Sequence, residues 1–498
     1  MKQRGIFLKR RGFLLGMFFV LALAPVLNGC STGQSTLARV LDVLNNDERP
    51  LPPEALKQLQ RFETVYKVYS SESTKRERLD YFGFAFRRVR AGYVTEVSDA
   101  TLIDAAIRGV REKKPKPGSL EPKELIEYAL DTMVSSLDPH SSYLNIDEFR
   151  EYFVRNKGEF GGLGIEITME DGLVKVVSPI EGTPAEKAGL KSGDLITHVD
   201  GLKVKGRTLA EAVHQMRGRP GSEITLMIRR KETSDFPVTL VRAVIKIKAV
   251  RWRIEDDIGY VRVSRFSERT EPGVEKAFAD IHKKLGSRLA GVVLDLRNNG
   301  GGLLNQSLIL ADNFLDKGEI VSIRGRDPQH YRSHKAVRGD LANGKPLVVL
   351  INAGSASASE IVASALQYHK RATLMGIRSF GKGSVQTILP LPVEGGLKMT
   401  TALYYGPDGK TLQARGVIPD IFIDPEKKSD RKREKDTPGA ISAVGKAATP
   451  IHPGPHIAEI DCPEIGVKKD RTLGCALSFL HAGSQKKFLA MHGGRPQS

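Results

Sequence analysis

The chain has 498 residues, of which 40% are hydrophobic, and it carries a formal net charge of +18. Its length exceeds that of one ordinary core and predicts about two to four domains, and its hydrophobic content excludes a chain that is disordered throughout. The basic residues are scattered and form no nucleic-acid-binding motif, so the positive charge does not indicate a nucleic-acid partner.

The N-terminal segment, residues 1–30, is predicted to be a bacterial export signal. Basic residues open it, and the apolar run that follows at 13–27 is too short for a typical membrane span. The run ends in LNGC, which resembles the lipobox of lipoprotein signal peptides, so Cys30 is predicted to be lipidated and to become the mature N-terminus. A plain cleaved signal peptide is the alternative, and Arg10 and Arg11 also resemble a twin-arginine export motif.

Export places the mature chain in an oxidising compartment outside the cytoplasm. Ser31 follows Cys30, and the absence of an acidic residue at this position favours the outer membrane among exported lipoproteins. The other two cysteines, Cys462 and Cys475, are predicted as a possible disulfide, and their spacing fits no zinc-binding pattern. We therefore expect a protein that is lipid-anchored on the periplasmic side of the cell envelope.

Five regions follow the export signal. Residues 31–53 are polar and end in a proline-rich linker, and 54–157 carry apolar residues at helical spacing, which predicts an N-terminal helical region. Residues 158–245 contain short strand-like runs, and 246–424 alternate strand-like and helical patterns, which predicts an α/β core. Residues 425–498 combine a basic, charge-dense linker with a proline- and glycine-rich C-terminal tail, in which we expect little core.

A candidate nucleophile lies where an apolar strand passes through small residues into a helix, in LVVLINAGSASASE at 347–360. A serine here, such as Ser357, would benefit from the free N–H groups and the positive dipole end of the helix N-terminus. His369 lies 12 residues further along the same predicted helix, about 18 Å away, and cannot serve as its base. An ordinary serine-rich helix cap is the alternative.

A lysine takes the place of histidine as the candidate base. Lys382 lies between two glycines in FGKGSVQ, and burial would lower the pKa of its amine from about 10.4 toward neutrality. On a strand, Lys382, Ser384 and Gln386 point to the same face, so that Gln386 can orient the amine. The alternative is a turn lysine in solvent.

Three glycines after a second apolar strand supply a candidate oxyanion hole. In LDLRNNGGG, the turn at 300–302 allows backbone N–H groups to come close to a ligand. Taken alone, this cluster is equally consistent with an ordinary glycine-rich loop.

Together these motifs resemble those of the carboxy-terminal processing (tail-specific) proteases of bacteria. The resemblance covers about residues 80–424 and includes LDPHSSYL, LDLRNNGGG, SASASEIVASAL, FGKGSVQ and GVIPDI in that order. It implies a crotonase/ClpP-like α/β protease core with an inserted PDZ domain and an N-terminal helical region. It also implies the following site: Ser357 as nucleophile, Lys382 as base, Gln386 as the residue that orients the lysine, and Ala358 with Gly301 or Gly302 as oxyanion-hole donors.

The β-rich region resembles the PDZ domain of the same family. Its GGLGI sequence implies a loop whose backbone N–H groups, at Gly162, Leu163, Gly164 and Ile165, receive the carboxylate of a peptide C-terminus. The strand that follows would pair with the extended peptide. The later GTPAEKAGL, GD and VDG sequences are typical of such modules, and a generic β-rich domain is the alternative.

The sequence therefore predicts a serine endopeptidase that captures protein C-terminal tails and cleaves through an acyl-enzyme. No metal and no organic cofactor is implied, and the resemblance adds envelope proteins as substrates and an adaptor lipoprotein as partner. Two alternatives stay open: a PDZ scaffold that lacks catalysis, and a Ser/Lys hydrolase of non-peptide substrates. The chain departs from the family pattern at about 111–124, which reads as an insertion, and after 425.

Overall fold

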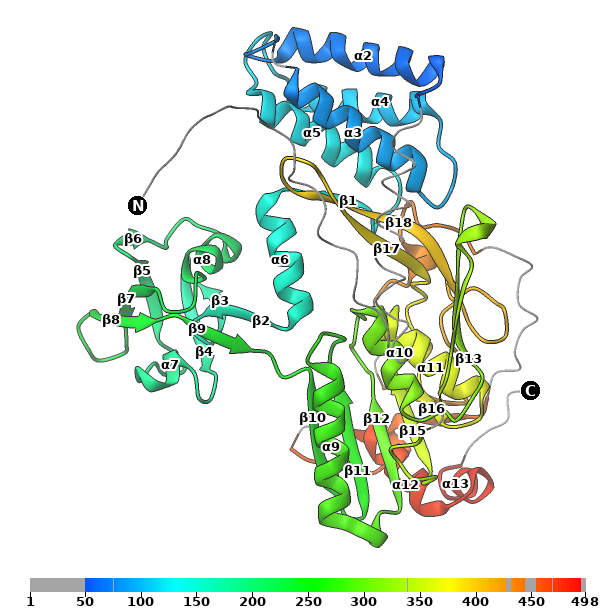
Figure 1. The fold of residues 1–498 in the computed structure, drawn as a ribbon. Helices are drawn as coiled ribbons and strands as arrows, with labels where there is room; N and C mark the ends of the chain where they lie inside the picture. Colours follow the sequence, from blue (N-terminus) through cyan, green and yellow to red (C-terminus); the bar gives the residue numbers. More distant parts are fainter. Residues whose placement is uncertain are drawn as a thin grey trace, which may run out of the picture. The chain divides into compact units, whose positions relative to one another are not determined.

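The computed structural model describes residues 50–493, apart from 75, 338, 427–430, 444–453 and 468 (Figure 1). The export signal with Cys30, and nearly all of the predicted linker at 31–53, lie outside the described residues. Within the described ranges, no helix is both long enough and apolar enough to cross a membrane.

Four helices in the described part of the chain form the N-terminal helical region, drawn in blue and cyan in Figure 1. They are α2 (Pro53–Tyr69), α3 (Glu77–Gly92), α4 (Asp99–Glu112) and α5 (Pro122–Ser135). Helix α4 begins at the cap residue Ser98, whose hydroxyl accepts the N–H of Thr101, and it buries one apolar stripe against its neighbours. Tyr143, Leu397 and Met399, which belong to a neighbouring sheet, complete this core.

The β-rich region folds into an antiparallel sheet with two short helices. Its strands are β3 (Ile165–Glu170), β4 (Leu173–Pro179), β5 (Leu195–Val199), β6 (Leu202–Lys203), β7 (Glu223–Arg229) and β8 (Phe236–Val241), and its helices are α7 (Pro184–Lys187) and α8 (Leu209–Met216). The order is β3-β4-β5-β7-β8, with β6 paired to β5. Along β7, Ile224, Leu226 and Ile228 are buried in alternation, as the strand period of two predicts.

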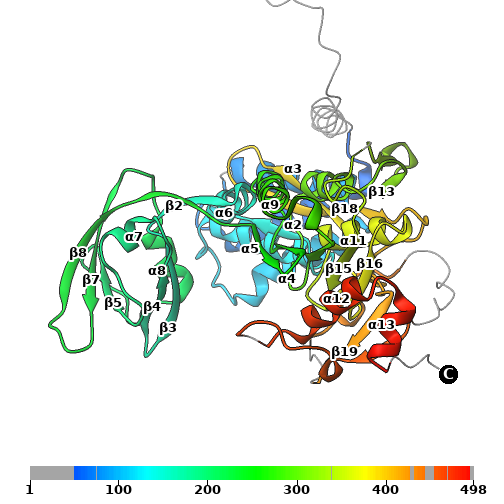
Figure 2. The same ribbon diagram turned by 90° about the horizontal axis from the view of Figure 1, so that it is seen from below.

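Two strands and one helix flank this β-rich region in the chain. Helix α6 (Ile146–Lys157) precedes it and leads into β2 (Glu159–Gly162), as Figure 2 shows, and β2 forms an antiparallel pair with β9 (Ala243–Lys246) that joins the two ends of the region (Figure 1). Both chain connections therefore leave the region at the same place, as expected for a module inserted into another domain.

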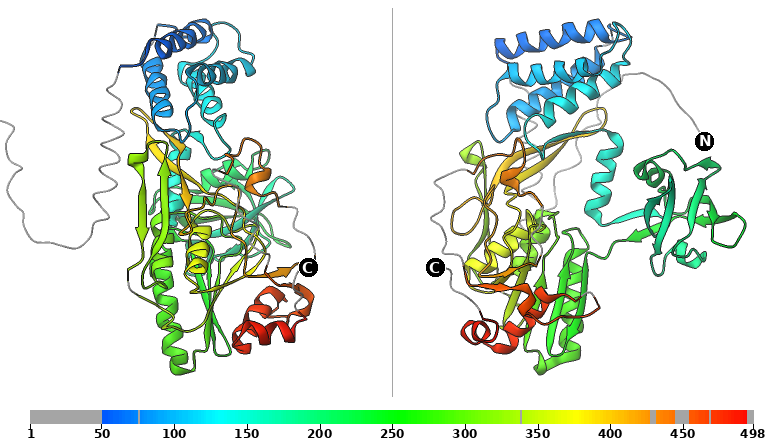
Figure 3. Two further views of the ribbon diagram at one scale, coloured as in Figure 1. Left: turned by 90° about the vertical axis from the view of Figure 1, so that its right-hand side faces the viewer. Right: turned by 180° about the vertical axis from the view of Figure 1, so that it is seen from behind.

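The α/β core is built, in the described residues, on a seven-stranded sheet. Its order is β10 (Val250–Glu255), β11 (Ile258–Val263), β12 (Gly291–Asp295), β15 (Leu347–Ile351), β16 (Thr373–Gly376), β19 (Ile421–Asp424) and β20 (His456–Ala458), and all neighbours except β10 and β11 are parallel. One face, with Val292 and Val349, packs against α9 (Thr270–Leu285), α10 (Leu304–Asp312) and α11 (Ala358–Tyr368). The other face, with Val293 and Val348, packs against α12 (Arg471–Ala482) and α13 (Gln485–Met491), drawn in red in Figure 3.

A second sheet is antiparallel and carries the FGKGSVQ motif at the start of one strand. Its order is β1 (Ser142–Leu144), β18 (Gly396–Tyr405), β13 (Glu319–Gly325) and β14 (Arg332–Lys335), and β17 (Ser384–Pro390) also pairs with β18. Because side chains alternate, Leu397 and Met399 point into the helical region, whereas Lys398 and Thr400 share the opposite face with Gln386. Short 3-10 helices lie in the connections: η2 (Gly286–Arg288), η3 (Pro328–His330), η4 (Glu434–Asp436) and η5 (Glu459–Asp461).

The C-terminal segment differs from its sequence-based expectation. We expected little core after 425, but β20 extends the core sheet, and α12 buries Leu473, Cys475 and Leu480 against it. The apolar residues of α12 recur at helical spacing, and this amphipathic stripe is what packs on the sheet. Cys462 and Cys475 form a disulfide with Cα atoms 5.0 Å apart. The expectation of a tail without core is therefore wrong for 456–491, whereas the predicted helical region, β-rich module and α/β core are present.

Candidate active site

Ser357 lies at the junction between β15 and α11, in a turn of small residues. Its backbone has φ 56° and ψ −114°, an uncommon conformation for a residue with a side chain and one that clusters at functional sites. Its N–H donates to Glu360 Oε2 at 2.8 Å, and Glu360 lies in the first turn of α11. The start of the helix therefore holds the backbone of the candidate nucleophile.

The two neighbouring serines are fully buried and are bonded to the segment that contains the glycine turn. Ser355 Oγ donates to the carbonyl of Leu296 at 2.8 Å, and Ser359 Oγ donates to the carbonyl of Asn299 at 2.8 Å. Ser357 is half-buried, and within the described residues its hydroxyl donates to no carbonyl. Of the three serines, Ser357 is thus the one whose proton remains available for transfer.

Lys382 lies half-buried in the turn before β17. Its Nζ donates to the carbonyl of Ser384 at 3.2 Å and to Gln386 Oε1. Gln386 is itself held, because its Nε2 donates to Ser384 Oγ at 2.9 Å and to Thr400 Oγ1 at 3.2 Å. The three side chains that the sequence placed on one face do meet, although Lys382 lies before the strand rather than in it.

The surroundings of Lys382 favour its neutral form. Burial, and next the charge of Lys398, lower the pKa of the Lys382 amine to about 8, while the carboxylates of Glu434, Asp138 and Glu360 act in the opposite direction. A neutral amine still has two N–H groups, one for each of its two acceptors, and its lone pair is then free to accept a proton. Lys382 is therefore suited to act as a base near neutral pH.

Glu360 links the turns that carry Ser357 and Lys382, and sequence reasoning missed it. Its carboxylate is fully buried; Oε2 accepts the N–H groups of Ser357 at 2.8 Å and Lys382 at 2.9 Å, and Oε1 accepts that of Gly381 at 2.7 Å. Burial raises the pKa of Glu360, and these hydrogen bonds counter the shift. Because both turns donate to one oxygen, the carboxylate sets their separation. The S-x-x-E spacing of a capping box was the sequence signal for this residue.

The side chains of Ser357 and Lys382 are not hydrogen-bonded to each other in the described structure. Lys382 Nζ instead donates to Ser384 and Gln386. A base must come within about 3 Å of the group whose proton it takes, and such contacts often tighten only when substrate is bound. Since the two backbones already share Glu360, we expect substrate binding to bring the two side chains together.

The glycine turn lies directly against the candidate nucleophile. Gly301 has φ 100°, and a Cβ atom there would lie 2.9 Å from Ser357 Cβ, so only glycine fits. The N–H of Gly301 donates to Asn299 Oδ1 at 2.9 Å and is thus already used. Within the part of the chain that the structure describes, the N–H groups of Gly302 and Ala358 have no acceptor. Of the two glycines that the sequence left open, Gly302 is therefore the better candidate for an oxyanion-hole donor, together with Ala358.

A buried ion-pair network anchors the segment before this turn. Arg297 Nη2 lies 2.7 Å from Asp295 Oδ2 and 2.7 Å from Asp470 Oδ2, and Tyr260 also donates to Asp295 at 2.7 Å. Burial works to lower the pKa of Arg297, but the two carboxylates outweigh it and raise the pKa, so the arginine stays charged. Asp470 caps α12 by accepting the N–H of Leu473 at 3.0 Å. The C-terminal helix thereby holds the strand that leads to the glycine turn.

The predicted carboxylate-binding loop lies between β2 and β3. Gly162 ends β2 and Ile165 begins β3. The carbonyl of Leu163 accepts the N–H of Ala185 in α7, and the carbonyl of Gly164 accepts that of Ile180 in the preceding segment. Gly164 has φ 77°, and a Cβ atom there would lie 2.3 Å from Thr183 Cβ, so the turn requires glycine. Among the described residues, the N–H groups of Leu163 and Gly164 find no acceptor. The loop therefore presents backbone donors that an anionic group can use.

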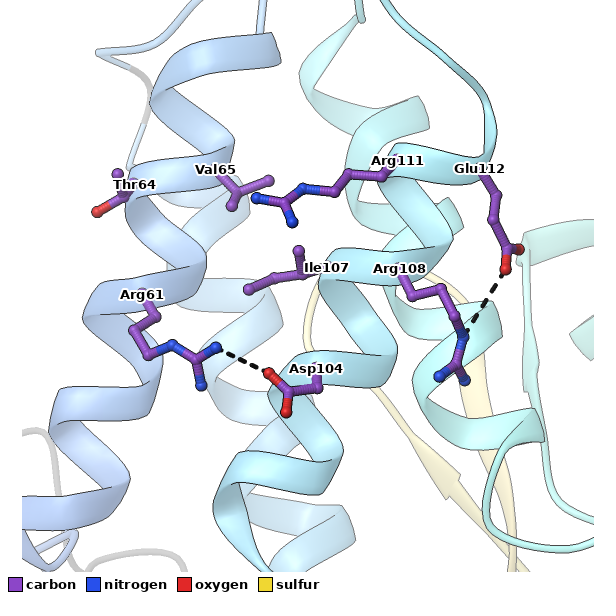
Figure 4. A pocket seen from close by; sticks show the side chains of 8 residues that line it. All are labelled: Arg61, Thr64, Val65, Asp104, Ile107, Arg108, Arg111 and Glu112. Carbon is purple, nitrogen blue, oxygen red and sulfur yellow. Dashed lines mark hydrogen bonds and ion pairs between the residues drawn. The ribbon is translucent and has the colours of Figure 1, made fainter.

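A cavity of about 690 Å³ lies between α2 and α4, in the helical region (Figure 4). Arg61 pairs with Asp104 at 2.8 Å and Arg108 with Glu112 at 3.7 Å along its wall. The lining residues are Arg61, Thr64, Val65, Asp104, Ile107, Arg108, Arg111 and Glu112. None of the predicted site residues is among them, so this cavity is separate from the candidate active site.

Known proteins match the two regions that carry these sites. Peptidase family S41 matches residues 257–423, and the PDZ domain family matches 161–240. A carboxy-terminal-processing protease from Bartonella bacilliformis is 49% identical over 363 residues, which cover 72% of this chain and 78% of the relative. A probable CtpA-like serine protease from Staphylococcus aureus is 35% identical over 307 residues, or 61% of each chain. Among solved structures, the photosystem II D1 C-terminal processing protease is 31% identical, with a TM-score of 0.43, and covers 70% of this chain and 94% of its own.

Proposed function

The chain belongs to the carboxy-terminal-processing proteases of peptidase family S41, and on that premise we propose that it is an endopeptidase with a Ser357/Lys382 mechanism that acts on protein C-terminal tails. The observation that carries the mechanism is that Lys382 Nζ donates to two uncharged acceptors, Ser384 O and Gln386 Oε1, while desolvation, and next the charge of Lys398, lower the pKa of its amine to about 8. At neutral pH a fraction of the Lys382 side chains is therefore uncharged and able to accept a proton.

The proposed reaction uses each part of the site in turn. The neutral amine of Lys382 takes the Ser357 hydroxyl proton as Oγ attacks the peptide carbonyl carbon, and the tetrahedral oxyanion is stabilised by the N–H groups of Ala358 and Gly302. The Lys382 ammonium then protonates the leaving amine, and an acyl-enzyme remains on Ser357. Lys382, neutral again, removes a proton from the water that attacks the ester, and it gives this proton to Ser357 Oγ as the acyl group leaves, which restores the free enzyme.

Substrate selection is assigned to the PDZ domain. The N–H groups of Leu163 and Gly164, which have no acceptor among the described residues, would receive a terminal carboxylate, and the adjacent strand β3 would provide an edge for the extended tail. Partly buried side chains of β3 and α8, Ile165, Ile167 and Leu209, pack on the apolar core of this domain and favour an apolar tail. Terminal capture also argues against a non-peptide substrate, for which such a loop has no use.

The experiment that tests this proposal compares one unstructured protein substrate with and without an apolar C-terminal tail. Wild type is expected to cleave the tailed form faster, and Ser357→Ala is expected to bind it without cleaving it. A protein that binds tails but cleaves neither substrate under any condition would instead be a PDZ scaffold. Equal cleavage of both substrates would support the proposed catalysis but would contradict the proposal that the protein recognises C-terminal tails.

The cellular location is part of the same proposal. The LNGC sequence supports lipidation at Cys30 and an anchor in the outer membrane facing the periplasm, where envelope proteins would be substrates and an adaptor lipoprotein a partner. Wild type should then fractionate with membranes and carry an acyl mass on its N-terminus, whereas Cys30→Ala should be released or remain unprocessed. A fully soluble wild-type protein without an acyl group would exclude the anchor and leave the protease proposal intact.

A further inference from the structure

A short stretch of the C-terminal segment reaches the turn that carries Lys382. The 3-10 helix η4 begins at Glu434, whose side chain is fully buried, and its N–H donates to the carbonyl of Phe380 at 3.1 Å. Glu434 lies beyond residue 423, where the match to peptidase family S41 ends. A residue outside the matched protease region is thus built into the wall of the candidate active site.

The carboxylate of Glu434 is connected to the lysine turn through one side chain. Gln413 Nε2 donates to Glu434 Oε1 at 2.8 Å, and Gln413 Oε1 accepts the N–H of Gly383 at 2.9 Å. Gly383 follows Lys382 directly, and the N–H of Lys382 is held from the other side by Glu360. The backbone of the lysine turn is therefore fixed by two buried carboxylates, one directly and one through Gln413.

The opposite side of Glu434 contacts the LDPHSSYL sequence. His140 Nε2 lies 2.9 Å from Glu434 Oε2 and 3.0 Å from Oε1. Burial works to raise the pKa of Glu434, but the hydrogen bonds from His140 and Gln413 outweigh it and lower the pKa, so the group is ionised. A buried carboxylate is strongly destabilising when it loses its partners. The positions of His140 and Gln413 relative to Glu434 are therefore tightly constrained.

We propose that Glu434 is a positioning residue for the catalytic lysine, which it holds in place through Gln413 and Gly383, so that the C-terminal segment completes the active site. This inference rests on the proposed Ser/Lys function, and it adds Glu434 as a residue that supports the function. Glu434 does not touch the reacting atoms. Its effect passes through the backbone of the lysine turn and through its charge.

The charge of Glu434 gives the proposal a second, independent readout. Four charged groups face Lys382 from different elements: Lys398 on β18, Glu434 in η4, Asp138 in the turn before β1, and Glu360 on α11. Lys398 favours the neutral amine, and the three carboxylates favour the ammonium form. Removing the charge of Glu434 therefore lowers the pKa of Lys382, and since the neutral amine is the base, the pH-rate profile moves to lower pH.

The decisive variant is Glu434→Gln, which keeps the size of the side chain and removes its charge. We expect kcat on a tailed substrate to fall about ten- to a hundredfold through loss of position, KM to change little, and the midpoint of the kcat profile to move to lower pH. Glu434→Asp keeps the charge and shortens the side chain, so it should lower kcat while its midpoint stays near that of wild type. Asp436→Asn removes an exposed carboxylate from the same 3-10 helix and should match wild type in all three quantities.

Titration of the Lys382 amine provides a measurement that needs no turnover. In protein with carbon-13-labelled lysine and Ser357→Ala, adding Glu434→Gln should lower the pKa of Lys382, and Asp436→Asn should leave it unchanged. A Glu434→Gln protein that is folded and has the kcat, pH midpoint and lysine titration of wild type overturns the positioning role. If Ser357→Ala or Lys382→Arg retain activity in parallel assays, the Ser/Lys function itself fails, which is a distinguishable result.

Discussion

Two glycine-containing loops of this protein use their backbone N–H groups in opposite ways. In the lysine turn, the N–H groups of Gly381 and Lys382 donate to Glu360, and that of Gly383 donates to Gln413. In the loop between β2 and β3, the carbonyl groups are bonded, but the N–H groups of Leu163 and Gly164 have no acceptor among the described residues. The comparison indicates that the first loop is built to hold a side chain still, whereas the second keeps its donors open for a ligand.

The difference follows from what each task requires. The proposed base acts only when its amine is held within a narrow range of positions, and the three backbone N–H groups at 381–383 are each held by a buried side chain, Glu360 or Gln413. A carboxylate receptor needs donors that lose water and gain an anion on binding, so its N–H groups must be unoccupied in the free protein. Changes in the first loop should therefore reduce kcat, and changes in the second should raise KM.

The largest effect is expected from Ser357→Ala, which removes the proposed nucleophile and little volume. Turnover of a tailed substrate should be abolished while binding of the tail persists. Ser355→Ala and Ser359→Ala are the matched controls, because their hydroxyls donate to main-chain carbonyls of Leu296 and Asn299. Each should cost about 1–3 kcal/mol of stability, measured by denaturant unfolding, and retain most activity. Retained turnover in Ser357→Ala would move the nucleophile elsewhere.

Nearly as large an effect is expected from Lys382→Arg. Arginine keeps the positive charge but is never deprotonated in a protein, so it cannot accept the serine proton. For wild type, burial lowers the pKa of Lys382 to about 8, so kcat should rise as the pH increases from 7 to 9 and level off above that. Lys382→Arg should be inactive at every pH in that range. A variant with substantial activity, or a wild-type profile that falls over this interval, would contradict the assignment of the base.

A smaller loss of kcat is expected from Glu360→Gln, which tests how firmly the lysine turn must be held. The amide replaces one acceptor oxygen by an NH₂ donor. In one orientation this donor faces the N–H groups of Ser357 and Lys382, and in the other it faces the N–H of Gly381, so hydrogen bonds are lost either way. We expect kcat to fall about a hundredfold, with KM for the tailed substrate nearly unchanged. Glu112→Gln, at an exposed position of α4, is the control and should behave as wild type. A rise in KM without a change in kcat would place Glu360 in substrate binding instead.

The sequence identified the candidate site residues that lie in continuous motifs, and their roles remain predictions. Ser357, Lys382, Gln386 and the GGLGI loop all come from short stretches whose order matches one family. Contacts between distant segments were not readable: Arg297 and Asp470 are 173 positions apart, and His140 and Glu434 are 294 apart. Nothing in either local sequence shows that a charged residue will be buried beside a partner.

The C-terminal helix shows a different reason for a missed prediction. The sequence RTLGCALSFLHA has apolar residues at helical spacing, and α12 buries them against the sheet. The preceding stretch is rich in charge, proline and glycine, a composition that predicts little regular structure, yet β20 and two short 3-10 helices, η4 and η5, form within its described residues. The average composition of 425–498 therefore gives no indication of the amphipathic helix α12, which only the spacing of its apolar residues predicts.

The smallest effect is expected at the open loop, where the substrate rather than the protein is changed. Amidating the C-terminus of a tailed peptide removes the charge that the N–H groups of Leu163 and Gly164 are placed to receive, and hydrogen bonds to a charged group contribute about 1.5–3 kcal/mol. KM should therefore rise about ten- to a hundredfold, while kcat at saturation stays the same because the lysine turn is untouched. A peptide without the apolar tail is the control, since amidating it should change nothing. If the amidated and free tails are cleaved with equal KM, the N–H groups of this loop do not bind the terminal carboxylate. The difference between the two loops would then not correspond to a difference between catalysis and substrate binding.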